Sequence, residues 1–135
     1  MGNPVTTKSQ GICFAFPNVC FTPPITLPFP HGVPIPYPSI GQLSDATATA
    51  ASVKAGSNEV VIKSSTIPST TGDSAGSLGG VISGSVGGKV EFVTASNSVF
   101  AEGVAVVRMF DTTKQNNGNA QGTVLGGVPT VLVGG

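Results

Sequence analysis

The chain has 135 residues, enough for one domain with a modest core, and only 9% of them are charged, with six Lys plus Arg against six Asp plus Glu. Such a sequence lacks the basic surface that neutralises phosphates, so we expect no nucleic-acid partner. No apolar run approaches the roughly 20 residues that cross a bilayer, so we also expect no stable membrane insertion.

Residues 1–12 are polar, and we expect them to form an extended N-terminal arm. They lack the hydrophobic segment of a secretory signal peptide, which predicts synthesis in the cytoplasm. In that reducing compartment the two cysteines are expected to be free thiols or metal ligands rather than a disulfide.

Eight of the eleven prolines lie between Pro17 and Pro38. Proline fixes φ and has no N–H, so this segment is excluded from helices and central strands. Polyproline II or a run of rigid turns remains. Apolar side chains alternate with the prolines and charge is almost absent, so we predict an ordered, stiff loop system packed onto a β body rather than a disordered linker.

The segments after the prolines predict short strands. Residues 42–51 are compatible with a short helix after Asp45 or with extended chain. Two β-like runs, 52–54 and 60–64, flank a Gly-Ser-Asn turn and predict a hairpin, and the consecutive β-branched residues 60–62 are expected to be buried. Residues 89–95 alternate as in a half-buried strand.

Two further strand pairs are expected near the C-terminal end. Runs 98–101 and 104–110 predict a hairpin around Glu102 and Gly103, and runs 123–125 and 130–133 predict a closing pair of strands. Segment 68–88 contains seven glycines, which predict tight corners. Its apolar residues are expected to face the core, namely Leu78, Val81, Ile82 and Val86.

Together these segments predict an all-β fold, a small cone-like β domain of short hairpins with a Pro-rich N-terminal loop region. It forms a single domain over residues 1–135, of which 1–12 are the arm.

Two short motifs resemble catalytic signatures, and neither is complete. Residues 72–76, GDSAG, resemble the nucleophile motif of chymotrypsin-like proteases, but a serine nucleophile such as Ser74 needs a histidine base and an orienting acid. The only histidine is His31, within the proline segment. Residues 83–90 resemble a P-loop but lack its first glycine and its metal-binding hydroxyl. We therefore expect Asp73 to accept backbone hydrogen bonds in a turn, and we expect no catalytic residues, although a small hydrolase acting through Ser74 or Cys20 is a third hypothesis.

The soft metal ligands of the chain are Cys13, Cys20 and His31. Structural zinc has four N or S ligands, and spacings of seven and eleven residues do not match a zinc finger. Two alternatives stay open: a zinc site completed by water or another group, or two buried cysteines and an exposed loop histidine.

Several motifs occur in a characteristic order: Pro17-Asn18-Val19-Cys20 with Thr22-Pro23, residues 33–40 (VPIPYPSI), residues 70–76 (TTGDSAG), residues 88–92, residues 97–103, Arg108 with Asp111, and residues 116–119 (NNGN). Over about residues 13–122 they resemble the PAAR-like domain family. We interpret Arg108 and Asp111 as a structural ion pair.

The resemblance implies a function without turnover, so the protein is expected not to be an enzyme. The family is similar to PAAR proteins that cap the spike of contractile injection systems. A structural spike-tip protein would cap and sharpen a trimeric VgrG-like spike, of type VI secretion or a related extracellular injection particle, and aid membrane puncture and effector delivery. It would be assembled on the spike and delivered out of the cell or into a target cell. The alternative is an adaptor module of the same machinery that recruits an effector or a chaperone.

The resemblance also bears on the metal. PAAR proteins of the main branch hold a metal near the apex with three histidines and a cysteine. This chain has one histidine, so only a variant site with Cys13, Cys20 and His31 would remain.

Overall fold

The structure is a computed structural model that describes residues 3–9, 11–26 and 28–133. Within these residues it is all-β apart from one turn of 3₁₀ helix, so the predicted fold class is confirmed. The elements are β1 (Asn3–Val5), β2 (Ile12–Thr22), β3 (Val33–Gln42), η1 (Leu43–Asp45), β4 (Ala50–Ala55), β5 (Asn58–Val60), β6 (Thr66–Ile67), β7 (Gly79–Gly80), β8 (Val90–Phe92), β9 (Phe100–Ala101), β10 (Val104–Ala105), β11 (Thr112–Gln115), β12 (Ala120–Leu125) and β13 (Val128–Val133).

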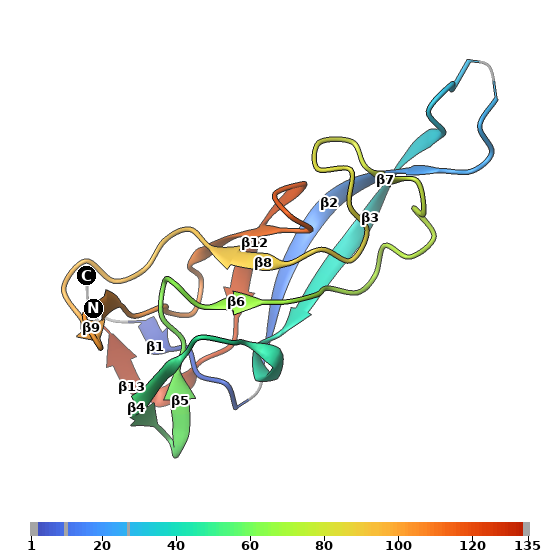
Figure 1. The fold of residues 1–135 in the computed structure, drawn as a ribbon. Coiled ribbons are helices and arrows are strands. Elements are labelled where there is room, and N and C mark those ends of the chain that lie inside the picture. Colours follow the sequence, from blue (N-terminus) through green and yellow to red (C-terminus); the bar gives the residue numbers. More distant parts are fainter. Residues whose placement is uncertain (1–2, 10, 27, 134–135) are drawn as a thin grey trace.

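One antiparallel sheet organises the molecule. Its strand order is β3-β2-β12-β11-β8-β6, and the short strand β7 also pairs with β2. The longest elements, β2 and β3, form a hairpin that extends beyond the rest of the sheet (Figure 1). Because β2 pairs with β12 at its beginning and with β7 near its end, it connects the body of the molecule to the projecting hairpin.

Part of the proline segment lies on strands β2 and β3, whereas Pro23, Pro24, Pro28 and Pro30 lie in the connection between them, which contains turns. Pro34, Pro36 and Pro38 lie on β3, the edge strand of the sheet, whereas Pro17 lies on the central strand β2, where the register with β3 shifts between Ala15 and Asn18. Pro34 and Pro36 alternate with residues that remain free to donate hydrogen bonds to β2. An edge strand tolerates proline because one of its sides needs no donor, and a bulge tolerates it within a sheet. The expectation of only polyproline II or turns was therefore wrong for the prolines on β3 and for Pro17 on β2.

Two apolar clusters form the core. One lies under the large sheet and contains Cys13, Leu43, Val61, Val90 and Val124 among its members. The other lies between the small β pairs at the opposite end of the molecule. The predicted hairpins are confirmed as the pairs β4–β5 and β9–β10, and the run 60–62 is buried as expected.

The terminal segments differ from the prediction. Of the expected arm, residues 1, 2 and 10 lie outside the described residues, but β1 pairs with β13 and the side chains of Val5, Thr6 and Thr7 are buried. The expected closing pair is also wrong, because β12 pairs with β11 and β2 whereas β13 pairs with β1. The segment near Asp45 contains η1, which ends at that residue instead of starting after it.

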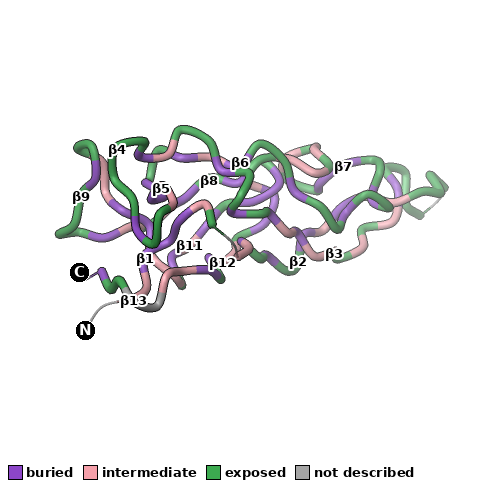
Figure 2. The backbone as a smooth tube through the Cα atoms, turned by 90° about the horizontal axis from the view of Figure 1, so that it is seen from below, coloured by how far each residue is buried: buried purple, intermediate pink, exposed green. Residues whose placement is uncertain are grey.

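The molecule tapers along its length (Figures 1 and 2). We call the projecting end of the β2–β3 hairpin, with the loop 77–88 beside it, the narrow end. We call the opposite end, formed by β1, β4, β5, β9, β10 and β13, the broad end. No helix among the described residues is long and apolar enough to cross a membrane.

Candidate functional site

The polar motif residues of the sequence meet in one buried cluster between β2 and the glycine-rich loop. Asn18 comes from β2, Asp73 from the Gly-Asp turn, and Asn116 and Asn119 from the turn between β11 and β12. All four side chains are buried, and we call them the asparagine network. Residues that lie far apart in the sequence are thus joined at the base of the narrow end.

Asp73 is the one formal charge in the asparagine network, and it accepts hydrogen bonds only from neutral groups. Asn18 Nδ2 donates to its Oδ2 at 2.8 Å, and the backbone N–H of Gly87 donates at 3.1 Å to both carboxylate oxygens. Such bonds compensate a buried carboxylate for its lost hydration. The expected role of Asp73 as an acceptor of backbone hydrogen bonds in a turn is confirmed.

Asn18 connects the other members. Its Oδ1 accepts from Asn119 Nδ2 at 2.6 Å and from Asn116 Nδ2 at 3.2 Å. Each of those amides has a second acceptor, Val19 O for Asn119 and Ser85 O for Asn116. One side chain on β2 therefore bonds both to the Gly-Asp turn and to the β11–β12 turn.

The asparagine oxygens hold the backbone of the glycine-rich loop. Ile82 and Ser83 donate their N–H groups to Asn119 Oδ1, at 2.8 and 3.2 Å, and Gly88 donates to Asn116 Oδ1 at 2.8 Å. A loop with little side-chain packing thereby gains fixed backbone partners.

Gly80 shows why this loop needs glycine. A Cβ at Gly80 would collide with the side-chain amide of Asn119. The absence of a side chain lets the loop backbone lie directly against the asparagine network, as close backbone approach requires.

The asparagine network has the chemistry of a structural brace. Burial, and secondarily the negative charge of Asp73, raise the pKa of the Cys20 thiol, so this thiol is not activated as a nucleophile. Within the described residues only two buried side-chain polar atoms lack a partner, Ser39 Oγ and Gln115 Oε1, and neither belongs to the network. The side chains of the network all bond to backbone groups or to one another, as a structural role requires.

The structure does not bring Cys13, Cys20 and His31 together. Cys13 lies in the core under the sheet, while Cys20 lies seven residues further along the same strand, which corresponds to roughly 23 Å. His31 is exposed in the hairpin end, with its ring 6.0 Å from that of Phe21. No group of three potential metal ligands occurs within the described residues. Both cysteines are buried free thiols, and burial raises the pKa of Cys13 to about 12.

The predicted ion pair is present. Arg108 Nη2 lies 2.9 Å from Asp111 Oδ1, and the same carboxylate accepts from the backbone N–H of Arg108 at 2.7 Å and from Thr94 Oγ1 at 2.9 Å. This pair fixes the turn that precedes β11, as the structural interpretation requires. Ser74 is exposed, and the neighbouring Asp73 bonds to Asn18 and Gly87 rather than to a histidine.

The broad end carries an apolar groove of about 140 Å³. Most of its lining comes from β1, β4, β5, β9 and β13, and it includes Val53, Phe100 and Val131, which are partly exposed. Two charged residues lie at this end: Lys54 lines the groove, and Glu102 follows Ala101 of the lining and accepts hydrogen bonds from the hydroxyl and the backbone N–H of Ser52, which lower its pKa. An apolar centre with a charged rim is typical of a surface that binds another protein.

The apolar residues of the glycine-rich loop are exposed, so their expected position in the core is wrong. Ile82 is 79% exposed, and Leu78, Val81 and Val86 are also exposed. The hydrogen bonds of the asparagine network hold the loop by its backbone, which leaves these side chains pointing away from the core. Alternation of glycine and apolar residues cannot by itself distinguish the two orientations.

Fold and site together define a small β domain that is braced by its polar motif residues and carries an apolar groove at its broad end. The chain belongs to the family described as Toxin PAAR-like domain, which matches residues 11–122, and this confirms the resemblance. It is 39% identical over 111 residues to the DNase toxin Tse7 of Pseudomonas aeruginosa. The match covers 80% of this chain and 29% of that toxin. No solved structure matches the chain.

The match to a toxin changes the functional expectation. That relative is described as a DNase, so the comparison does not support the prediction that the protein is not an enzyme, and it bears on the expected absence of a nucleic-acid partner. The chain spans less than a third of the relative's length.

Sequence reasoning named Asn18, Asp73 and residues 116–119 as motif members but did not predict that they meet. One signal was available: Asn18 interrupts an apolar run, and a buried amide is costly unless it finds hydrogen-bond partners. Pairing them requires the strand order, which the sequence does not provide.

Proposed function

We propose that this domain is the delivery module of a toxic effector in a type VI secretion system or a related contractile injection system. The family is described as a toxin PAAR-like domain. The segment that matches this chain is 29% of the DNase toxin Tse7, so most of that protein lies outside the match. The polar residues of the domain brace its fold. We therefore assign delivery to this domain and toxicity to another region or another protein. This domain would carry that toxic region or protein.

The partner that we propose for the broad end is the trimeric VgrG-like spike. A β spike ends in strands whose N–H and C=O groups are unpaired, and such ends accept additional strands. At the broad end, β13 pairs only with β1 within the described part of the chain, which leaves its other edge open beside the apolar groove. Groove and free edge together offer burial and hydrogen bonds to the same partner.

The single observation that carries this proposal is the opposition of the two ends. The groove with its charged rim lies at the broad end, whereas the molecule narrows to a hairpin at the other (Figures 1 and 2). A wedge of this form, seated by its base, would place the proline-braced hairpin foremost and sharpen the spike.

A matched pair of variants tests the proposal. The full chain is mixed with the purified spike trimer, and the stoichiometry and affinity are measured by native mass spectrometry and calorimetry. We expect one chain per trimer and a loss of affinity of about tenfold or more for Phe100→Lys, because Phe100 lines the groove and is 59% exposed. Ile82→Lys, at the other end, should bind as the wild type does.

Absence of binding to any spike trimer would overturn the spike proposal. If the chain instead captured an effector or a chaperone without a spike, the adaptor function would take its place. Equal losses for the two variants would show that the broad end is not the contact surface.

A further inference from the structure

A polar cavity of about 280 Å³ lies beside the apolar groove at the broad end. We call it the lysine pocket, and its lining residues are Lys8, Lys54, Ser57, Asn58 and Glu59. Lys54 lines both the pocket and the groove, so the two hollows adjoin. A protein that covers the groove next to Lys54 therefore comes within reach of the lysine pocket.

Three adjacent chain segments place the charged side chains of the pocket in one row. Lys54 on β4 pairs with Glu59 on β5. On the other side of β5, Thr7 pairs with Val60, and the N–H of Lys8 donates to the backbone oxygen of Glu59 at 3.0 Å. Residues that lie opposite one another in neighbouring antiparallel strands project to the same face. The two lysines thus flank Glu59.

The carboxylate of Glu59 bonds to a hydroxyl rather than to either lysine. Thr49 Oγ1 donates a hydrogen bond to Glu59 Oε1. Within the described part of the chain, neither Lys8 nor Lys54 lies within ion-pair distance of a carboxylate. Two ammonium groups and one carboxylate line the pocket, which leaves one positive charge in excess there.

This charge and these donors fit a single carboxylate. The ammonium groups, the Ser57 hydroxyl and the Asn58 amide are all of the kind that donates hydrogen bonds to a carboxylate oxygen. A nucleic acid presents a row of phosphates and is bound by several cations together, whereas here Glu59 separates two lysines and would repel a second negative charge. The pocket therefore matches an acidic side chain better than a phosphate backbone.

We propose that the lysine pocket binds an Asp or Glu side chain of the protein that occupies the apolar groove. This inference rests on the proposed function, in which that protein is the spike trimer. The groove supplies apolar area for burial, whereas the pocket attracts the partner at longer range and fixes its orientation. Lys8 and Lys54 are thus assigned to partner recognition at the broad end.

Calorimetric titration of the full chain with the spike trimer tests the inference at two salt concentrations. We expect the wild-type affinity to fall by about tenfold between about 50 and 500 mM NaCl, because salt screens the contact. At the lower concentration Lys8→Met and Lys54→Met should each bind about fivefold or more weakly than wild type, and their affinity should depend less on salt. Methionine keeps much of the apolar stem of lysine, so the substitution removes mainly the charge.

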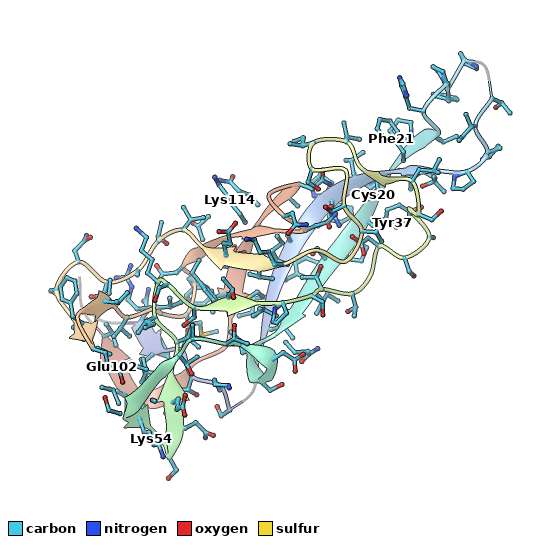
Figure 3. The ribbon with its side chains drawn as sticks, viewed as in Figure 1. Cys20, Phe21, Tyr37, Lys54, Glu102 and Lys114 are labelled. Atoms are coloured by element: carbon cyan, nitrogen blue, oxygen red, sulfur yellow. The ribbon has the colours of Figure 1, made fainter. Side chains whose placement is uncertain are left out.

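Lys114→Met is the matched control. Lys114 lies on β11 and, like Lys54, is exposed. Figure 3 shows it well away from Lys54 and Glu102, which lie at the broad end. Its replacement changes the net charge of the chain by the same amount, and it should leave both the affinity and its salt dependence at the wild-type values. Unchanged circular dichroism shows that the three variants fold.

The other outcomes separate this inference from the spike proposal. Absence of any complex with the spike would overturn both. A complex that is lost in Phe100→Lys but is bound equally by the wild type, Lys8→Met and Lys54→Met would overturn the inference alone. An equal loss in Lys114→Met would reduce the effect to net charge and would also overturn it. Binding of a DNA duplex that Lys8→Met and Lys54→Met abolish would reassign the pocket to phosphate groups.

Discussion

Replacing Asn18 with alanine tests whether the asparagine network braces the fold. The side chain is buried, donates to the Asp73 carboxylate at 2.8 Å, and accepts from Asn119 and Asn116. Its removal deletes these three bonds and the longer contact from Cys20 Sγ at 3.8 Å, and it leaves the buried carboxylate with Gly87 as its remaining donor. Asn116 and Asn119 keep their backbone acceptors, so neither amide is left without a partner.

The magnitude follows from these contacts. A hydrogen bond to a charged group contributes about 1.5–3 kcal/mol and each of the two neutral bonds about 1 kcal/mol. Asn18→Ala should therefore lower the free energy of unfolding by about 3–5 kcal/mol. Because a domain of this size has a total stability of roughly 5–15 kcal/mol, the variant should still fold at 25 °C. Its Tm should fall by about 10–20 °C.

Urea denaturation and calorimetry measure this loss, and Asn97→Ala serves as the matched control. Asn97 is exposed, so its replacement should change the stability by no more than about 0.5 kcal/mol. Hydrogen exchange should also show reduced protection of the Gly87 amide in Asn18→Ala. A loss below about 1 kcal/mol, or one equal to that of Asn97→Ala, would refute the assignment of the network as a structural brace.

Three further predictions concern stability. Burial raises the pKa of Cys13 to about 12, above its ordinary value of 9.0, so the unfolded chain loses the thiol proton at lower pH than the folded chain does. The free energy of unfolding should therefore be unaffected below pH 9 and should decline as the pH rises towards 12. Urea titrations at alkaline pH should show no such decline from this group in Cys13→Ser. Gly80→Ala should destabilise the fold by about 2 kcal/mol or more because its Cβ collides with Asn119, which thermal unfolding would show, whereas unchanged Tm would contradict the close approach. Arg108→Met should cost about 1–2 kcal/mol through loss of its pair with Asp111, and a neutral result in the same assay would show that the backbone and hydroxyl donors to that carboxylate suffice.

Local patterns predicted those parts of the fold that depend on local physics. The turn at Gly56 and the turn at Glu102 and Gly103 each join two strands, because a hairpin is determined by its own turn residues. Phe92 is buried and Glu91 exposed, as alternation along a strand requires. The ion pair of Arg108 and Asp111 could be predicted from a spacing of three residues.

Long-range pairing was beyond the sequence. Nothing in the terminal segments shows that β1 pairs with β13 rather than leaving β13 to β12, because both pairings satisfy the same local preferences. The proposed metal site had the same limitation. Cys13 and Cys20 are suitable ligands by residue type, but they lie seven residues apart on the extended strand β2 and so cannot bind the same ion. The exposure of Ile82 was missed because it depends on Asn119, which reaches the loop from a turn 37 residues away.

Amide side chains rather than ion pairs hold the glycine-rich loop to the rest of the sheet. The asparagine network lies between the ends, and its only charge, on Asp73, is buried and satisfied by neutral donors. A salt bridge in its place would require a cationic side chain at the base of the narrow end. The brace can therefore stiffen the narrow end without adding exposed charge to it, and we infer that this is why amides rather than ion pairs hold the glycine-rich loop.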